Sequence, residues 1–354
     1  MKRRSVLVTG SSGLIGSESV KRLCSEGYQV VGVDNDLRSY FFGPTASTLW
    51  NVELLTKNYP KLYKHESLDI RNKSALQNIF QNYNFEMIIH TAAQPSHDWA
   101  AKEPETDFSI NATGTLNLLE LTREYCRDAT FILTSTNKVY GDNPNLLPLT
   151  EQEMRFDLDM NHSSWHGIDE TMSIDSCTHS IFGVSKTAAD LMTQEYGRYF
   201  DMNTVVFRGG CLTGPLHSGA ELHGFLSYLV KAFAESRVYT IFGYKGKQVR
   251  DNIHSKDLIE MFIQFHKNPK PGAIYNAGGG RQNSLSILEA IKKISEICQK
   301  NLEVNLKSSN RLGDHKWYIT DFSKFRHDYP EWNITFSVDQ ILEEMISNAF
   351  SKQI

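Results

Sequence analysis

The chain has few cysteines, no long apolar run and no excess of basic charge. Its five cysteines show no Cys-x-x-Cys spacing, and their odd number fits reduced thiols in a cytoplasm. No stretch approaches the roughly 18 apolar residues that a membrane-spanning helix needs. The formal net charge of −4 provides no positive field to attract nucleic acid. These absences predict a cytoplasmic globular protein that binds neither membranes nor nucleic acids.

Short apolar runs alternate with helical patterns through the first half of the chain. The runs lie at 5–10, 29–35, 86–93, 130–135 and 203–210. Their apolar residues are continuous, which is typical of parallel strands that helices cover on both faces. A long polar and aromatic loop is expected after the second strand. We therefore predict an α/β fold, a Rossmann-type doubly wound parallel sheet.

A glycine-rich turn follows the first predicted strand. "TGSSGLIG" places Gly10, Gly13 and Gly16 between that strand and a helix predicted over 17–27. Glycines here permit a tight turn and let the backbone approach a pyrophosphate, which the N-terminus of the helix attracts. This turn predicts a dinucleotide site.

Two carboxylates follow the second and third predicted strands. Asp34 closes the second strand, where a carboxylate accepts hydrogen bonds from the adenosine ribose and disfavours a 2′-phosphate. Asp69 follows the third strand and is expected near the adenine. The sequence therefore predicts NAD, rather than NADP, as the cofactor.

The composition changes after the last of these strands, where glycine and aromatic residues become frequent. We predict that residues 1–208 and 246–277 form the NAD-binding Rossmann domain. Residues 209–245 and 278–354 are expected to form a smaller C-terminal substrate lobe.

Four motifs occur in a characteristic order: "TGSSGLIG", "HTAAQPS", "TSTNKVYGD" and "FGVSK". The chain resembles the extended short-chain dehydrogenases/reductases that modify nucleotide-linked sugars, and "VVFRGGCLTGP" and "QVRDNIHSKDL" extend the resemblance over nearly its whole length. "HTAAQPSHDWA" and "TSTNKVYGD" look most like the CDP-paratose (CDP-tyvelose) 2-epimerase branch. The resemblance implies NAD-dependent epimerisation of a nucleotide sugar for surface polysaccharide, usually by a homodimer.

The resemblance also implies roles for residues of the cofactor site. Ala92 and Ala93 match the backbone that passes the cofactor. Thr136 matches the Ser/Thr that hydrogen-bonds the reacting sugar hydroxyl. Lys186 matches the lysine that holds the nicotinamide ribose and lowers the pKa of a catalytic tyrosine.

Substrate residues are implied in the same way. Arg250 and Arg311 match basic residues that meet the nucleotide diphosphate, whereas Cys211 replaces an asparagine that binds phosphate in many relatives. Asn137 and Lys138 occupy the places of the Asp-Glu pair of sugar 4,6-dehydratases, so elimination is not expected. Asn137 is a candidate for orienting the substrate.

One position departs from the family pattern. In "HSIFGVSK", Phe182 stands four residues before Lys186, where relatives have the catalytic tyrosine. Residues four apart share a helix face, so a lysine here stabilises a phenolate in those relatives. Phenylalanine cannot exchange a proton at all.

Three interpretations of this replacement stay open. Another group could transfer the proton: Thr136 through a relay, Tyr140, Cys177 or His179. His179 is the most attractive because an imidazole titrates near neutral pH. Lys186, desolvated beside the cofactor, could act as the base itself. In the third interpretation, catalysis is lost and the protein only binds NAD or a nucleotide sugar. If the protein is an active enzyme, C4 epimerisation and net dehydrogenation are alternatives to C2 epimerisation.

A long connection at 142–181 carries several metal-ligand types. Asp157, Asp159, His162 and His166 fall within "DLDMNHSSWHGIDE". The segment lacks helical periodicity, so we predict a loop that covers the substrate and no metal.

Overall fold

A computed structural model of the chain describes residues 4–217, 219, 224–309 and 313–351. The chain folds as two compact units. The first unit consists of Met1–Thr136, Ile181–Arg208 and Ile259–Tyr275, and the second unit of Asn137–Ser180, Gly209–Leu258 and Asn276–Ile354.

This division differs from the predicted domains in three segments, the last of which is only residues 276–277. Residues 137–180 and 246–258 belong to the second unit, although the sequence placed them in the cofactor domain. The earlier segment contributes Tyr140 and Leu158 to an apolar cluster of the second unit, and the later one contains a strand that pairs with three strands of that unit. Both assignments depend on tertiary packing that the sequence pattern does not reveal.

A seven-stranded sheet forms the frame of the first unit. Its order is β12-β8-β5-β4-β1-β2-β3. The strands are β1 (Ser5–Thr9), β2 (Gln29–Asp34), β3 (Tyr63–Ser67), β4 (Phe85–His90), β5 (Thr130–Thr136), β8 (Thr204–Gly209) and β12 (Ala273–Ala277). β3, β2, β1, β4 and β5 pair in parallel. The strand order reverses between β1 and β4, which is where open α/β sheets bind ligands at the carboxyl ends of their strands. The predicted Rossmann-type fold is confirmed.

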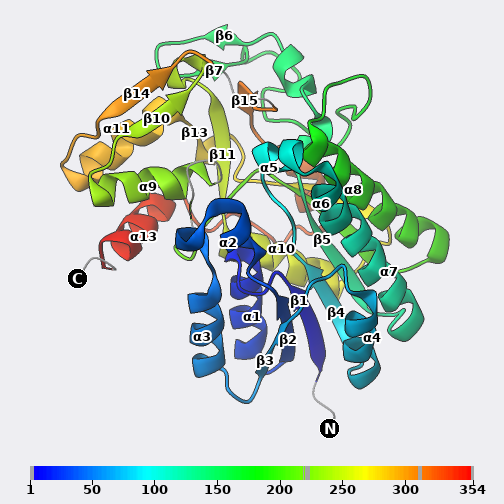
Figure 1. Cartoon of the computed structure of the whole chain (residues 1–354). Helices are drawn as coiled ribbons and strands as arrows, with labels where there is room; N and C mark the ends of the chain where they lie inside the picture. Colours follow the sequence, from blue (N-terminus) through cyan, green and yellow to red (C-terminus); the bar gives the residue numbers. More distant parts are fainter. Residues whose placement is uncertain (1–3, 218, 220–223, 310–312, 352–354) are drawn as a thin grey trace. The chain divides into compact units, whose positions relative to one another are not determined.

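Helices cover both faces of this sheet. On one face, α1 packs on β1, β2 and α3; on the other, α4 contacts α7 and α7 contacts α8, as Figure 1 shows. The helices are α1 (Leu14–Ser25), α3 (Leu49–Asn58), α4 (Lys73–Asn82), α7 (Gly114–Tyr125), α8 (Ile181–Phe200) and α10 (Ser255–Lys267). Val6, Leu7 and Val8 of β1 are fully buried because neither face of the strand meets water.

The loop expected after the second strand contains two helices, so that prediction is wrong. They are α2 (Leu37–Phe42) and α3. Phe41 of α2 is buried and packs edge-on against Trp99, with ring centroids 5.5 Å apart. Asp36 accepts hydrogen bonds from Ser47 Oγ and Thr48 N, both at 2.8 Å, before α3 begins. Packing against Trp99, which lies outside the segment, and the hydrogen bonds of Asp36 within it therefore order the segment.

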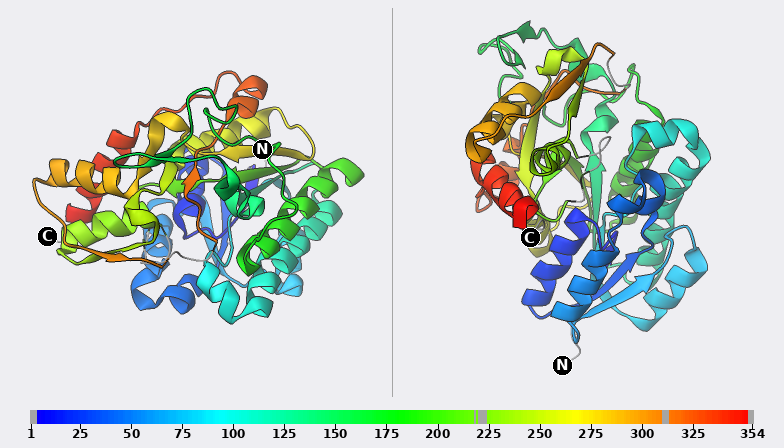
Figure 2. Two further views of the ribbon diagram at one scale, coloured as in Figure 1. Left: turned by 90° about the horizontal axis from the view of Figure 1, so that it is seen from above. Right: turned by 60° about the vertical axis from the view of Figure 1, so that its left-hand side comes forward.

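Within the described residues, the second unit contains three small sheets and several helices. β11 pairs in parallel with β9 and β15 and antiparallel with β13, while β10 pairs with β14 and β6 with β7. The strands are β6 (Thr150–Glu151), β7 (Phe156–Asp157), β9 (Cys211–Thr213), β10 (Tyr239–Phe242), β11 (Val249–His254), β13 (Ser284–Ser286), β14 (Val304–Lys307) and β15 (Trp317–Tyr318). The helices are α9 (Phe225–Glu235), α11 (Ile287–Cys298), α12 (Ser323–Asp328) and α13 (Val338–Ser351). α9, α11 and α13 share one apolar core, and Figure 2 shows them grouped together.

Candidate active site

The glycine turn between β1 and α1 leaves room for a ligand. Gly10 has φ +68°, and a Cβ there would lie 2.7 Å from Ala92 N; a Cβ at Gly16 would lie 2.0 Å from Gly10 O. The fold itself therefore requires these two glycines. At Gly13, which has an ordinary φ of −70°, a Cβ would contact only Gly10 O, at 3.3 Å. The missing side chain at Gly13 therefore leaves the N-terminus of α1 accessible, and this arrangement fits a pyrophosphate.

Asp34 lies beside the glycine turn, and its role toward the adenosine ribose stays a prediction. Its Oδ2 accepts a hydrogen bond of 3.1 Å from Ser12 N in the glycine turn, and its Oδ1 accepts one of 2.9 Å from Asp36 N. The carboxylate is thus fixed at the end of β2, beside the turn. Ala92, which follows β4, contacts the same turn through Gly10, and Ala93 follows it in the chain.

Asp69 follows β3 and is held by neighbouring side chains. Its carboxylate accepts hydrogen bonds from Arg71 Nε at 3.0 Å, Arg71 Nη2 at 2.7 Å and Asn35 Nδ2 at 3.1 Å. Partial burial alone would raise the pKa of Asp69, but the hydrogen bonds and charge of Arg71 hold that pKa below its ordinary value. Because Asn35 follows Asp34 directly, both carboxylates lie at the same end of the sheet. The adenine contact of Asp69 stays a prediction.

Replacing Asp34 by asparagine should weaken the preference for NAD over NADP. A charge-assisted hydrogen bond contributes about 1.5–3 kcal/mol, so the ratio of the two affinities should fall by about 10- to 100-fold. Isothermal titration of nucleotide-free protein with each dinucleotide measures this ratio. Glu53→Gln, on the exposed side of α3, is the matched control; an unchanged ratio in Asp34→Asn would contradict the assignment.

Lys186 and Phe182 lie one turn apart on α8. Lys186 is only 4 % exposed, and its Nζ donates a hydrogen bond of 3.0 Å to Thr134 O on β5. Burial lowers the pKa of Lys186 to about 8, although the charges of Asp190 and Asp107 oppose the shift. Thr136 ends the same strand. The structure therefore brings the predicted Lys186 to the strand that carries Thr136.

A buried ion pair supports this part of α8, and the sequence analysis missed it. Asp190 is fully buried and Arg208 of β8 is 3 % exposed. Asp190 accepts hydrogen bonds of 3.0 Å from Nε and Nη2 of Arg208 and from Ser135 Oγ on β5. The pair joins three elements next to Lys186. Its only sequence signal is an acid four residues after that lysine.

A buried polar network supports the start of α8. Gln94, in the loop after β4, donates 2.9 Å and 2.7 Å hydrogen bonds from N and Nε2 to Asn111 Oδ1 and Asp107 Oδ1. Asn111 Nδ2 donates to Ser185 Oγ, which donates to Phe182 O, both at 3.0 Å. Asn111 lies on a π-helical turn, Ser109–Thr113, a feature frequent at functional sites. The network fixes the β4 loop against the turn that carries Phe182.

Arg250, in the second unit, forms an internal ion pair. Its guanidinium contacts the carboxylate of Asp314 and donates to Val249 O at 2.7 Å. Burial alone would raise the pKa of Asp314, but the charges of Arg250 and Lys138 hold it well below its ordinary value. The role of Arg250 toward a diphosphate stays a prediction. The role of Asn137 toward the substrate also stays a prediction; this residue is buried at the start of a short 3-10 turn. Arg311 lies outside the described residues.

The alternative proton-transfer groups make internal contacts in the second unit. Tyr140 is fully buried, and its hydroxyl donates to Asn276 Oδ1 at 2.8 Å. Burial raises the pKa of the Cys177 thiol, which disfavours the thiolate. His179 Nε2 lies 2.8 Å from Val139 O; because a carbonyl oxygen only accepts, this nitrogen carries a proton. Its Nδ1 lies 3.6 Å from Cys177 Sγ. These contacts favour an architectural role for all three.

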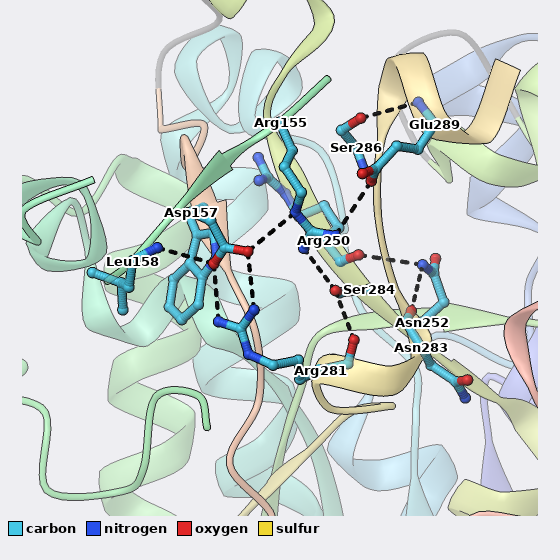
Figure 3. A network of polar contacts seen from close by, with 11 residues as sticks. Arg155, Asp157, Leu158, Arg250, Asn252, Arg281, Asn283, Ser284, Ser286 and Glu289 are labelled. Atoms are coloured by element: carbon cyan, nitrogen blue, oxygen red, sulfur yellow. Dashed lines mark hydrogen bonds and ion pairs between the residues drawn. The ribbon is translucent and has the colours of Figure 1, made fainter. Parts of the chain in front are cut away.

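Arginines connect the segment over 137–180 to other segments of the second unit (Figure 3). Asp157 accepts hydrogen bonds of 2.9 Å from Nη1 and Nη2 of Arg281 and lies 3.3 Å from Arg155 Nε. The Arg281 guanidinium also lies 3.4 Å from the centroid of the Trp165 ring. Two cations thus neutralise Asp157, one of the four residues of a metal-ligand type in this segment. Within the described ranges, no three His, Cys, Asp or Glu side chains are grouped as a metal site would need.

No helix in the part of the chain that the structure describes combines the length and apolarity needed to cross a bilayer.

Comparisons with known proteins agree with this arrangement. Residues 6–278 match the family described as the NAD dependent epimerase/dehydratase family. CDP-paratose 2-epimerase of Salmonella typhi is 31 % identical over 350 residues, which are 96 % of this chain and 97 % of that protein. UDP-glucose 4-epimerase of Yersinia pestis is 30 % identical over 344 residues, 95 % of this chain and 94 % of that protein.

Solved structures show the same fold. The crystal structure of UDP-glucuronic acid 4-epimerase from Bacillus cereus, in complex with UDP-glucuronic acid and NAD, superposes with a TM-score of 0.78 at 24 % identity, covering 99 % of each chain. The family match spans the glycine turn, Asp34 and Lys186, so the predicted cofactor agrees with the family. The chain thus belongs to the NAD-dependent epimerase/dehydratase family, and its cofactor is NAD.

Proposed function

We propose that this protein epimerises a nucleotide-activated sugar, and that its substrate is a CDP-deoxyhexose inverted at C2 for surface polysaccharide synthesis. The observation that carries the proposal is the buried Lys186, held against the end of β5 in the unit that also carries the open glycine turn. The similarity to CDP-paratose 2-epimerase supports the choice of substrate. Because a UDP-glucose 4-epimerase is almost equally similar, C4 epimerisation of another nucleotide sugar is the second candidate. The expected homodimer stays a prediction.

The cofactor and three side chains of the first unit each have a defined part in this proposal. NAD, when bound, supplies the hydride acceptor that takes hydrogen from the sugar carbon and returns it to the opposite face. Thr136 hydrogen-bonds the reacting hydroxyl, and Lys186 orients the nicotinamide ribose and contributes positive charge. Phe182 occupies the place of the family tyrosine and keeps water away from the reacting carbon.

The residues after β5 support epimerisation rather than dehydration. Loss of a sugar hydroxyl requires a proton donor for the leaving oxygen. Asn137 has no acidic proton, and Lys138 Nζ donates to Gly313 O at 2.9 Å and lies 4.0 Å from Asp314 Oδ1. Because Asn137 can act as neither acid nor base, the two side chains do not together supply the acid and the base that an elimination needs.

Proton NMR in D2O tests the proposal directly. The purified protein is incubated with CDP-paratose, and then with a panel of CDP-, UDP-, GDP- and dTDP-sugars. We expect a new epimer that retains its carbon-bound hydrogen, because a hydride held on the cofactor does not exchange with solvent. Boiled protein is the control.

Two outcomes would contradict epimerisation. Bound NAD without any product across the panel would indicate a protein that only binds its ligands. Stoichiometric consumption of added NAD would indicate a net dehydrogenase.

A further inference from the structure

The ring of Phe182 packs against an imidazole. The rings of Phe182 and His97 are arranged edge to face, with centroids 4.9 Å apart and planes inclined at 65°. Both residues belong to the first unit. A tyrosine at position 182 would carry its hydroxyl on the rim of this ring. The structure therefore places the imidazole of His97, which can exchange a proton, against the ring of Phe182, which cannot.

The backbone around His97 is fixed by hydrogen bonds. His97 is the first residue of α5 (His97–Lys102), and Ser96 caps that helix by accepting a hydrogen bond of 3.3 Å from Trp99 N. Gln94 Nε2 donates to Ser96 O at 2.8 Å and belongs to the network that holds the start of α8. α5 packs directly on α8. The positions of His97 and Phe182 are thus set by the same buried polar groups.

The role left open by Phe182 needs a group that both accepts and donates a proton. Helices α6 (Pro104–Phe108) and α8, which pack on α5, carry the charged side chains Asp107 and Lys186. A neutral imidazole accepts a proton and returns it as imidazolium, the exchange that the family tyrosine performs.

We propose that His97 replaces the missing tyrosine as the group that removes and returns the hydroxyl proton of the sugar; this inference rests on the proposed function. When the O–H bond breaks, its proton passes to an imidazole nitrogen of His97. The C–H electron pair leaves with its hydrogen as hydride to NAD⁺, and a C=O bond forms. Both transfers reverse when hydride returns to the opposite face, so the cofactor and His97 end as they began.

His97→Ala tests the inference in the full-length holoenzyme. General acid–base catalysis contributes about 10²- to 10⁴-fold, so kcat should fall at least 100-fold, with bound NAD and affinity for the nucleotide sugar kept. Added imidazole should restore part of the rate. The double variant His97→Ala/Phe182→Tyr should regain at least tenfold, because a phenol beside Lys186 then replaces the imidazole. Exposed His327→Ala on α12 is the control and should keep the wild-type rate.

A second measurement does not depend on turnover. Diethyl pyrocarbonate modifies accessible imidazoles, and mass spectrometry reports the rate at each histidine. We expect bound CDP-sugar to slow modification of His97 and to leave that of His327 unchanged. Equal rates at His97 with and without the nucleotide sugar would overturn the proposal.

The remaining outcomes also decide the question. A His97→Ala enzyme within threefold of the wild-type rate would overturn the inference and leave the proposed function intact. A loss that neither imidazole nor Phe182→Tyr restores would indicate a structural role only. A wild-type enzyme that converts no nucleotide sugar would overturn the proposed function and this inference together. Should the alanine variant fail to fold, His97→Gln, which keeps a polar planar group, takes its place.

Discussion

The Lys186→Met variant is expected to lose about 10²- to 10⁴-fold in kcat, the range of a group that assists proton transfer. Methionine matches the length of the lysine stem but removes its charge and its hydrogen bond to Thr134 O. The NMR assay with the preferred nucleotide sugar measures the loss. Exposed Lys57→Met on α3 is the matched control, and a kcat within tenfold of the wild type would contradict a role for Lys186 in the chemistry.

The dependence of the rate on pH separates the two roles that the sequence left open for Lys186. Its pKa is lowered to about 8 by burial, so the group is a cation below that pH and neutral above it. A cation that orients the nicotinamide ribose and contributes positive charge to the site predicts that kcat falls as pH rises through about 8. A lysine acting as the base predicts the opposite, a fall as pH drops below about 8. We expect the first profile.

The same shift affects stability with a definite sign. Lys186 has a folded pKa of about 8 against an ordinary value of 10.5, so between these values the unfolded chain binds more protons than the folded one. Stability from this group therefore rises with pH over that interval. Denaturation at several pH values should show the rise in the wild type and its absence in Lys186→Met.

Asp190→Ala should lower the free energy of unfolding by about 3–5 kcal/mol, because removing one partner of a buried pair leaves an uncompensated charge. Arg208 would lose both hydrogen bonds to Asp190, and Ser135 would lose its acceptor. Urea denaturation followed by circular dichroism measures the change. Glu195→Ala on the same helix breaks only an exposed pair with Arg198 and should change stability by less than about 1 kcal/mol. A loss below that value in Asp190→Ala would contradict the importance of the pair.

The sequence predicted the parts of the fold that depend on neighbouring residues. Continuous apolar runs identified β1, β2, β4, β5 and β8, and the glycine spacing located the turn before α1. The helices that order the segment after β2 were missed because Phe41 is buried against Trp99, and that contact joins distant parts of the chain. The spacing of apolar residues along the chain does not reveal a contact with a residue that is distant in the sequence.

The candidate site shows the same limit. Asp34 and Lys186 were predicted because each belongs to a motif with fixed spacing. His97 stands inside a motif that the sequence analysis quoted, yet nothing in its spacing connects it to Phe182, 85 positions further along the printed sequence. Only the packing of α5 on α8 brings the two rings together. His179, three residues before Phe182, was favoured instead because an imidazole titrates near neutral pH.

The division of each unit into three chain segments has a consequence for synthesis on the ribosome. β5 is complete at residue 136, but its outer neighbour β8 begins at residue 204, and β12 begins at residue 273. Until β8 emerges, β5 presents an unpaired edge that carries Phe131, Ile132 and Leu133, and β8 then presents the open edge until β12 emerges. Exposed apolar edges of this kind pair readily with other chains. A nascent chain is therefore vulnerable to aggregation until nearly four-fifths of it has been translated, and early termination within that span leaves an incomplete sheet.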